Sequence, residues 1–245
     1  MFNKQSTFVA FLDILGFSDL VTNNSHDELI TIYKQLDFCV QSALSNFNYD
    51  ISFKGTRPVE YVHNLGATTV NSMTISDSII LWTNDDSIDD FRNLILTTKF
   101  LLYECFTVGL PLRGGIAIGP LSIMSDRYHT PHYNQRNTFF GKSIVDAYRL
   151  EQKQKWSGCT ISRDCINHLF PQNQIPDDIS NQITQYPVPF KTHKNSEYVI
   201  KWPIDSVDLR KRAVIESFSC HKKRITSFAV RRLIVNTLRF IHYIN

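Results

Sequence analysis

Alternating and continuous runs of apolar residues mark the predicted strands of this chain. The run TFVAFLDIL at residues 7–15 is rich in β-forming residues and stops at Gly16, which predicts a buried strand. In SMTISDSIILW, residues 72–82, apolar and polar positions alternate as far as Asp77 and then become continuously apolar, so we predict a hairpin that turns there. Residues 110–124, LPLRGGIAIGPLSIM, predict a further strand whose glycines allow another backbone to approach.

Apolar positions at helical spacing separate these strands. Ser25 followed by Glu28 is a capping-box pattern, and the apolar stripe behind it predicts a helix that extends to about Asn46. Residues 87–108 carry a second apolar stripe with a serine at the N-cap position. A third helix is predicted from about Lys142, directly after a glycine.

The remaining segments are less regular. Residues 47–70 predict a loop or irregular insertion, and residues 125–138 predict a polar loop. Residues 159–170 indicate a short strand and helix, residues 171–207 are rich in Pro and Asn with one strand candidate, EYVIKW, and residues 208–244 indicate one or two basic helices. The predicted order β-α-β-β-α-β-β-α-β-α indicates an α+β fold in which helices cover a mostly antiparallel sheet.

Composition narrows the class of protein. Hydrophobic residues make up 42% and charged residues 20% of the 245 residues, as is typical of globular domains. We expect a cytoplasmic protein without a membrane partner, because no apolar run approaches the roughly 20 residues of a membrane span and no secretory cleavage site follows the N-terminus. The five cysteines are odd in number and form no CxxC motif, which indicates reduced, mostly buried thiols instead of disulfides or a zinc site.

Positive charge is concentrated near the C-terminus. Residues 201–245 hold ten Lys or Arg against three Asp or Glu, although the net charge of the chain is only +3. A solvated helix face is the commoner explanation, and an acidic partner, nucleic acid or a membrane surface are the alternatives.

Two aspartates are the candidate chemical groups. Asp13 and Asp77 each interrupt an apolar strand segment where the chain turns, and a buried carboxylate is costly unless it is paired. Converging carboxylates bind Mg²⁺ or Mn²⁺, and two such ions can promote an in-line displacement at phosphorus. The alternative is that each carboxylate caps a separate turn.

The loop after Asp13 is a candidate phosphate site. Residues 15–18, Leu-Gly-Phe-Ser, connect the predicted strand to a helix start, where backbone N–H groups can point outward. Asp19 argues against this interpretation, because its charge lies close to the expected anion.

Four segments, in order, resemble the catalytic domain of the class III nucleotidyl cyclases. They are FLDILGFSDL, ISDSIILW, LPLRGGIAIG and GKSIVDAYRLE, and the resemblance covers residues 7–170. It implies a ferredoxin-like α+β fold, with a catalytic domain at residues 1–170 and an extension with a strand and basic helices at residues 171–245.

The resemblance also implies roles for individual residues. Asp13 and Asp77 become ligands of two Mn²⁺ or Mg²⁺ ions, and the carbonyl of Ile14 completes the metal site. Gly16, Phe17 and Ser18 cradle the triphosphate, together with the backbone of Ile14. Arg149 becomes the arginine that stabilises the transition state, and the alternative is that it pairs with a neighbour on its own helix.

Two departures from the family concern the base of the nucleotide. Val145 stands where purine cyclases carry a catalytic asparagine, and Met73 stands where many carry a base-reading lysine. In these features, and in the RGGIA and AYRLE segments, the chain resembles the Pycsar pyrimidine cyclases, which make cyclic UMP or cyclic CMP during phage infection and so activate a separate effector. Expected partners are therefore UTP or CTP and a second copy of the chain that completes each active site, without nucleic acid. An inactive nucleotide-binding or partner-binding domain and a purine cyclase with an altered base pocket are the alternatives.

Overall fold

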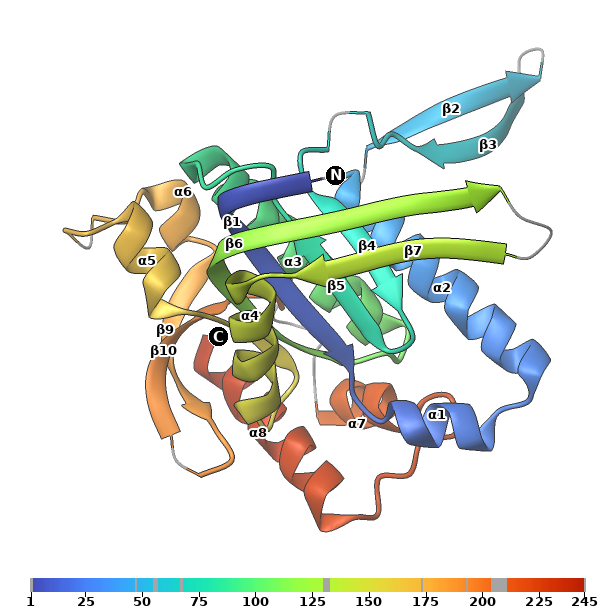
Figure 1. Ribbon diagram of the computed structural model, residues 1–245. Coiled ribbons are helices and arrows are strands. Elements are labelled where there is room, and N and C mark those ends of the chain that lie inside the picture. The colour runs from blue at the N-terminus through green and yellow to red at the C-terminus, as the bar shows by residue number, and fades with distance from the viewer. Residues whose placement is uncertain are drawn as a thin grey trace.

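An eight-stranded sheet forms the centre of the computed structural model (Figure 1). The structure describes residues 2–46, 48–54, 57–66, 68–129, 133–172, 174–192, 194–203 and 211–244. The sheet has the order β4-β5-β1-β6-β8-β10-β9, with β7 paired to β6. Its strands are β1 (Phe2–Ile14), β4 (Asn71–Ile75), β5 (Ser78–Trp82), β6 (Leu112–His129), β7 (Tyr133–Phe140), β8 (Gly158–Ile161), β9 (Ile183–Pro189) and β10 (Lys194–Ile200).

The pairing of the strands is mostly antiparallel, as predicted. β1 lies between β5 and β6 and runs antiparallel to both, whereas β6 and β8 form a parallel pair. Helices cover both faces of this sheet, so the predicted α+β class is confirmed.

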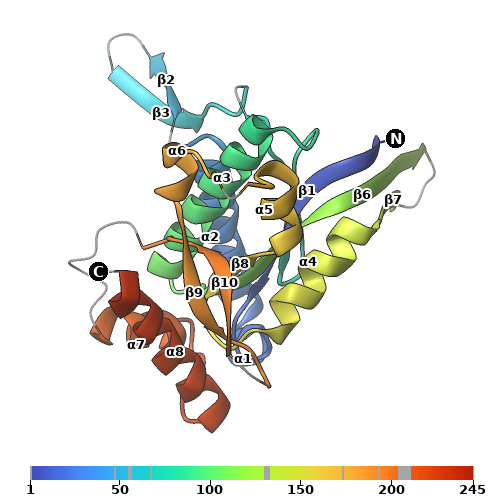
Figure 2. The same ribbon diagram turned by 90° about the vertical axis from the view of Figure 1, so that its left-hand side faces the viewer.

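Most helices lie on one face of the sheet. α2 (His26–Leu44) and α3 (Ile88–Thr107) cover this face, whereas α4 (Lys142–Lys153) lies on the other (Figure 2). Side chains alternate along β1, so Phe8, Ala10 and Leu12 join the core under α2 and α3, and Val9 and Phe11 point toward α4. Asp13 continues this second series and therefore lies on the α4 face.

The helix and turn signals in the sequence are confirmed. Ser25 and Glu28 form the capping box of α2, and the side chain of Ser87 accepts a hydrogen bond from the Asp90 N–H at the start of α3. The hairpin between β4 and β5 turns at Ser76 and Asp77, as the alternation predicted.

Three of the irregular segments were predicted wrongly. Residues 47–70 contain a separate hairpin of β2 (Tyr49–Lys54) and β3 (Arg57–His63). The predicted polar loop at residues 125–138 contains the end of β6 and most of β7. In residues 171–207 the strand candidate EYVIKW is confirmed by β10, but β9 and α6 (Asp177–Ser180) were missed. β2 does alternate apolar and polar residues, but it is short and followed by Gly and Pro, whereas most of β7 is polar because cross-strand backbone hydrogen bonds need no apolar side chains.

The C-terminal segments pack on the same core. After the short helix α5 (Arg163–Leu169), β9 and β10 extend the sheet beyond β8. α7 (Lys211–Ser219) and α8 (Phe228–Ile244) follow; Phe218 packs on Phe106 of α3, and Phe240 packs edge-on against Trp156. Among the described residues, no helix has both the length and the apolar character needed to cross a bilayer.

Candidate active site

Asp13 and Asp77 lie together at one end of the sheet. Asp13 is near the end of β1, opposite Arg113 of β6 and Ser78 of β5, and Asp77 is in the turn that precedes β5. The Ile14 N–H donates to the Asp77 carbonyl over 3.0 Å, and the two carboxyl groups are close enough to form a hydrogen bond.

The turn that carries Asp77 is held from a second direction. Ser76 has a φ of 56°, a left-handed conformation that non-glycine residues adopt rarely. The hydroxyl of Tyr33 in α2 donates to the Ser76 carbonyl over 3.1 Å. The sheet and α2 together therefore fix the position of this turn.

Asp13 is held in an unfavourable electrostatic environment. Burial raises the pKa of Asp13 to about 7, and the negative charges of Glu151 and Asp77 contribute to this increase. Arg113 opposes the shift, and its Nη2 atom lies 3.7 Å from Asp13 Oδ2. This single guanidinium therefore compensates only part of the negative charge of the site.

Glu151 and Arg113 form a buried ion pair beneath Asp13. Glu151, in α4, is fully buried, and the side chain of Arg113 is 13% exposed. Arg113 also donates to the carbonyl of Gln154 over 3.2 Å. Burial raises the pKa of Glu151, whereas Arg113 lowers it. Sequence reasoning missed Glu151, although this residue ends the cyclase-like segment AYRLE.

The chemistry of this site suits a hard divalent cation. Asp13 and Asp77 supply carboxylate oxygens beside the backbone of Ile14, and their mutual repulsion is relieved when a cation neutralises them. The described residues contain no cluster of three or more His, Cys, Asp or Glu side chains arranged to bind a metal. A cation at this site would have Asp13 and Asp77 as its side-chain ligands, and backbone or phosphate oxygens would complete the coordination.

The loop after β1 has the geometry of a helix start. Gly16 has a φ of 81° and precedes α1 (Phe17–Asn23), and its carbonyl accepts from the Leu20 N–H over 3.0 Å. Gly16 and Ser18 are exposed, whereas Phe17 packs against the core. The start of α1 thus lies just beyond Asp13 in the chain, where the sequence predicted the phosphate cradle.

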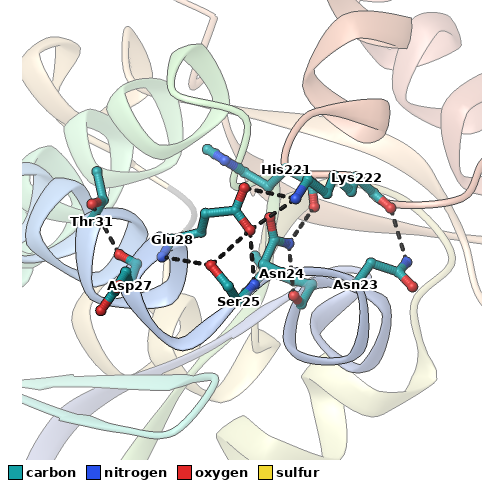
Figure 3. A network of polar contacts seen from close by, with 9 residues as sticks. Asn23, Asn24, Ser25, Asp27, Glu28, Thr31, His221 and Lys222 are labelled. Atoms are coloured by element: carbon teal, nitrogen blue, oxygen red, sulfur yellow. Dashed lines mark hydrogen bonds and ion pairs between the residues drawn. The ribbon is translucent and has the colours of Figure 1, made fainter.

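A C-terminal segment holds this loop in place. We call residues His221–Arg224, between α7 and α8, the C-terminal strap (Figure 3). The side chains of Asn23 and Asn24 donate to the carbonyls of Lys222 and His221 over 2.9 and 2.7 Å, and the Lys222 ammonium pairs with Glu28 at 2.7 Å (Figure 3). The strap therefore binds the end of α1 and the start of α2.

The strap also provides a hydrogen-bond partner for the Asp19 carboxylate. The Asp19 carboxylate accepts a hydrogen bond from the Arg224 N–H over 2.9 Å, so this charge anchors α1 to the strap. Lys223 is buried and its stem packs against Gly16, where an added Cβ atom would lie 3.0 Å from Lys223 Cδ. Its ammonium donates to the Gly109 carbonyl over 2.6 Å, and burial lowers the pKa of Lys223 to about 8.

Arg149 does not reach the aspartates within one chain. Its side chain is 68% exposed, and its Nη1 atom lies 3.8 Å from the Asp146 carboxylate of the same helix. Val145 and Tyr148, on the same helix, are also exposed. Met73 lies opposite Ile80 on the adjacent strand and packs against the apolar cluster of the α4 face, the face that bears Asp13.

Replacing Asp13 with asparagine is expected to stabilise the metal-free protein at pH 8. The folded-state pKa of about 7 exceeds the unfolded value near 3.9, so the wild type loses stability as the pH rises between these values. The neutral amide of the Asp13→Asn variant avoids this loss, and we expect a gain of about 2 kcal/mol at pH 8, half of the full linkage value of about 4 kcal/mol because the carboxyl group is partly exposed to solvent, and none below pH 4. Denaturant unfolding at both pH values measures the effect, and Mn²⁺ should stabilise only the wild type. Equal stability of the two proteins at pH 8 would contradict the assignment.

Comparison with solved structures identifies the fold. No family model matches the chain, and no curated protein matches it either. Among solved structures, the guanylate cyclase domain of RhGC from Catenaria anguillulae, in complex with GTP, matches with a TM-score of 0.53 and 15% identity, over 81% of this chain and 97% of that one.

Two further structures give the same result. A dimeric guanylyl cyclase domain from the aquatic fungus Blastocladiella emersonii matches with a TM-score of 0.53 and 15% identity, over 81% of this chain and 97% of that one. A bacterial light-regulated adenylyl cyclase matches with a TM-score of 0.50 and 12% identity, over 90% of this chain and 58% of that one. The chain has the fold of the class III nucleotidyl cyclase catalytic domain.

Proposed function

We propose that the protein is a nucleotidyl cyclase that converts UTP to cyclic UMP, or CTP to cyclic CMP, with release of pyrophosphate. The observation that carries this proposal is the juxtaposition of Asp13 and Asp77 beside the Gly16 loop on a cyclase fold. In this reaction the ribose 3′-oxygen attacks the α-phosphorus and loses its proton. The bond from the α-phosphorus to the bridging oxygen breaks, and pyrophosphate leaves.

The residues of the site would have different roles in this reaction. Asp13, Asp77 and the carbonyl of Ile14 would hold two Mn²⁺ or Mg²⁺ ions. When bound, these ions supply Lewis-acid chemistry that lowers the pKa of a hydroxyl and neutralises phosphate charge. The backbone of residues 16–18 would bind the triphosphate at the start of α1. Arg113 is paired with the buried Glu151 and lies beside Asp13, where its guanidinium offsets part of the negative charge of the site.

A second copy of the chain would complete the site. Arg149 is exposed and makes no contact with either aspartate in the described part of the chain, so its guanidinium is available to a partner's nucleotide. The side chains of Phe140, Val145 and Tyr148, at the end of β7 and on α4, are 43–47% exposed. These apolar surfaces support a homodimer in which the α4 of one protomer faces the aspartates of the other.

Two positions support a pyrimidine substrate. Val145 cannot supply the amide that purine cyclases place on this helix, and Met73 cannot donate a hydrogen bond to a purine base. The resemblance to the Pycsar enzymes further supports a cytoplasmic second-messenger synthase in phage defence, whose cyclic nucleotide acts on a separate effector. The structural neighbours are guanylate and adenylyl cyclases, which makes a purine cyclase with an altered base pocket the main alternative.

The alternative to an enzyme is a cyclase-like domain that has no catalytic activity. Val145 motivates it, because an asparagine at this position takes part in catalysis in the purine enzymes. Such a domain would bind a nucleotide or a protein partner without turnover.

Incubation of the folded dimer with each of the four NTPs and Mn²⁺ tests the proposal. We expect cyclic UMP or cyclic CMP together with equimolar pyrophosphate, and no product in EDTA. Cyclic AMP or cyclic GMP as the main product would establish the purine alternative. Absence of any cyclic product from a dimeric, folded sample would end the enzyme proposal.

A further inference from the structure

A groove lies between α8 and the tip of the β9–β10 hairpin, and these elements run side by side in both views (Figures 1 and 2). Its volume is about 500 Å³, within the range of sites that bind small organic molecules. The hairpin contributes Pro189 to Thr192, and α8 contributes one face between Phe228 and Arg239. None of the residues assigned to the candidate active site lines this groove.

Four cations line the groove, and none of them forms an ion pair with a carboxylate of the described residues, although Lys191 lies near enough to Glu151 to lower the pKa of that carboxyl group. They are Lys191 on the hairpin and Arg231, Arg232 and Arg239 on α8, and all four are exposed. Across the described ranges of the chain, no carboxylate lies within 4 Å of their side-chain nitrogens. Such a concentration of positive charge is self-repulsive until an anion binds.

Two further cations belong to the same region of the fold. The Lys191 N–H donates to the carbonyl of Lys153 over 2.7 Å, and the Lys155 N–H donates to the carbonyl of Pro189 over 2.9 Å. The backbone therefore brings residues 153–155 against the base of the hairpin, and neither lysine has an ion-pair partner within the described residues. They add to the positive potential around the groove.

The groove also contains an apolar surface and an exposed ring. The largely buried Pro189 and Phe190 line the hairpin side of the groove, and Val235, which is 44% exposed, contributes apolar area from α8. Phe228 is 80% exposed at the first position of α8, where the helix dipole is positive and the Ser227 hydroxyl accepts from the Val230 N–H over 3.2 Å. An aromatic ring beside guanidinium groups suits a flat, negatively charged ligand.

We propose that this groove is a second ligand site, which binds a nucleotide-like organic phosphate independently of the candidate active site. The three guanidinium groups offer forked donors that match phosphate oxygens, and the exposed ring of Phe228 offers a surface on which a base can stack. The concave shape and limited volume favour a mononucleotide over a flat membrane surface. None of the described residues that line the groove is a carboxylate, so we expect the ligand to bind in the absence of a divalent metal ion.

Calorimetric titration of the full chain in EDTA and low salt tests this site. UTP, uridine and inorganic triphosphate are the probes, and Arg232→Glu, Arg239→Glu and Phe228→Ala are the variants. The matched control is Lys34→Glu, which reverses an exposed cation on α2 away from the groove. Thermal unfolding of each variant verifies that the fold is retained.

The proposal predicts a different binding result for each probe. UTP should bind the wild type and Lys34→Glu equally, and should bind each arginine variant at least tenfold more weakly. Uridine should not bind, and Phe228→Ala should weaken UTP but not inorganic triphosphate. Equal UTP binding by all proteins would overturn the site. Groove-dependent binding of an oligonucleotide, an acidic peptide or anionic vesicles, without UTP binding, would overturn the nucleotide assignment. These results do not depend on turnover, so the cyclase proposal can fail separately.

Discussion

Replacing Asp77 with alanine is expected to reduce formation of the cyclic nucleotide by at least about 100-fold, a loss of roughly 3 kcal/mol or more in transition-state stabilisation. Asp77 lies in a turn, not in the core, and its backbone carbonyl, which accepts from the Ile14 N–H, survives the substitution. The fold should therefore remain intact while one of two carboxylate ligands is lost. Initial rates with UTP or CTP and saturating Mn²⁺ measure the effect.

Asp37→Ala is the control for this experiment. Asp37 is an exposed carboxylate on α2 that accepts a hydrogen bond from Gln41 on the same helix, so its loss should leave turnover nearly unchanged. A rate for Asp77→Ala within twofold of the wild type would remove Asp77 from the site.

Replacing Arg113 with methionine is expected to destabilise the protein by about 3–5 kcal/mol at pH 8, because it leaves the fully buried Glu151 charge without its partner. Methionine retains apolar volume, so the lost guanidinium, not a cavity, dominates the cost. Asp13 also loses its only neighbouring cation among the described residues, which raises its pKa further. Denaturant unfolding at pH 8 measures the difference in the free energy of unfolding.

The double variant Arg113→Met with Glu151→Gln separates charge from packing. Removing the orphaned carboxylate should restore at least half of the lost stability. If the double variant were as unstable as Arg113→Met alone, the effect would come from packing, and the buried ion pair would not be its cause.

The outline of the fold could be predicted because burial leaves a pattern in the sequence. β1 and the hairpin of β4 and β5 are apolar where they face the core, and α2 begins at a capping box that acts within four residues. β7 and β9 were missed because their polar and proline-containing sequences lack such a pattern, and pairing to neighbouring strands specifies them instead. The pattern of apolar residues in a segment indicates which of its side chains are buried. Strand pairing also depends on residues far away in the chain, so it cannot be predicted from the segment alone.

The candidate site was predictable only in part, for the same reason. Spacing alone left Asp13 and Asp77 as two separate turn caps, and the ordered set of cyclase-like segments favoured their convergence. The Ile14 to Asp77 hydrogen bond agrees with that prediction of proximity. Glu151 could not be assigned to Arg113 from sequence, because their contact depends on how α4 crosses β6.

The C-terminal strap has a consequence for biosynthesis. Asp19 and Gly16 are held by Arg224 and Lys223, about two hundred positions later in the chain. A ribosome therefore releases β1 and α1 long before the segment that fixes their junction has been made. The Gly16 loop therefore lacks these contacts until residues 221–224 emerge. If the Gly16 loop binds phosphate as proposed, nucleotide binding depends on a segment that is synthesised long after β1 and the turn that carries Asp77.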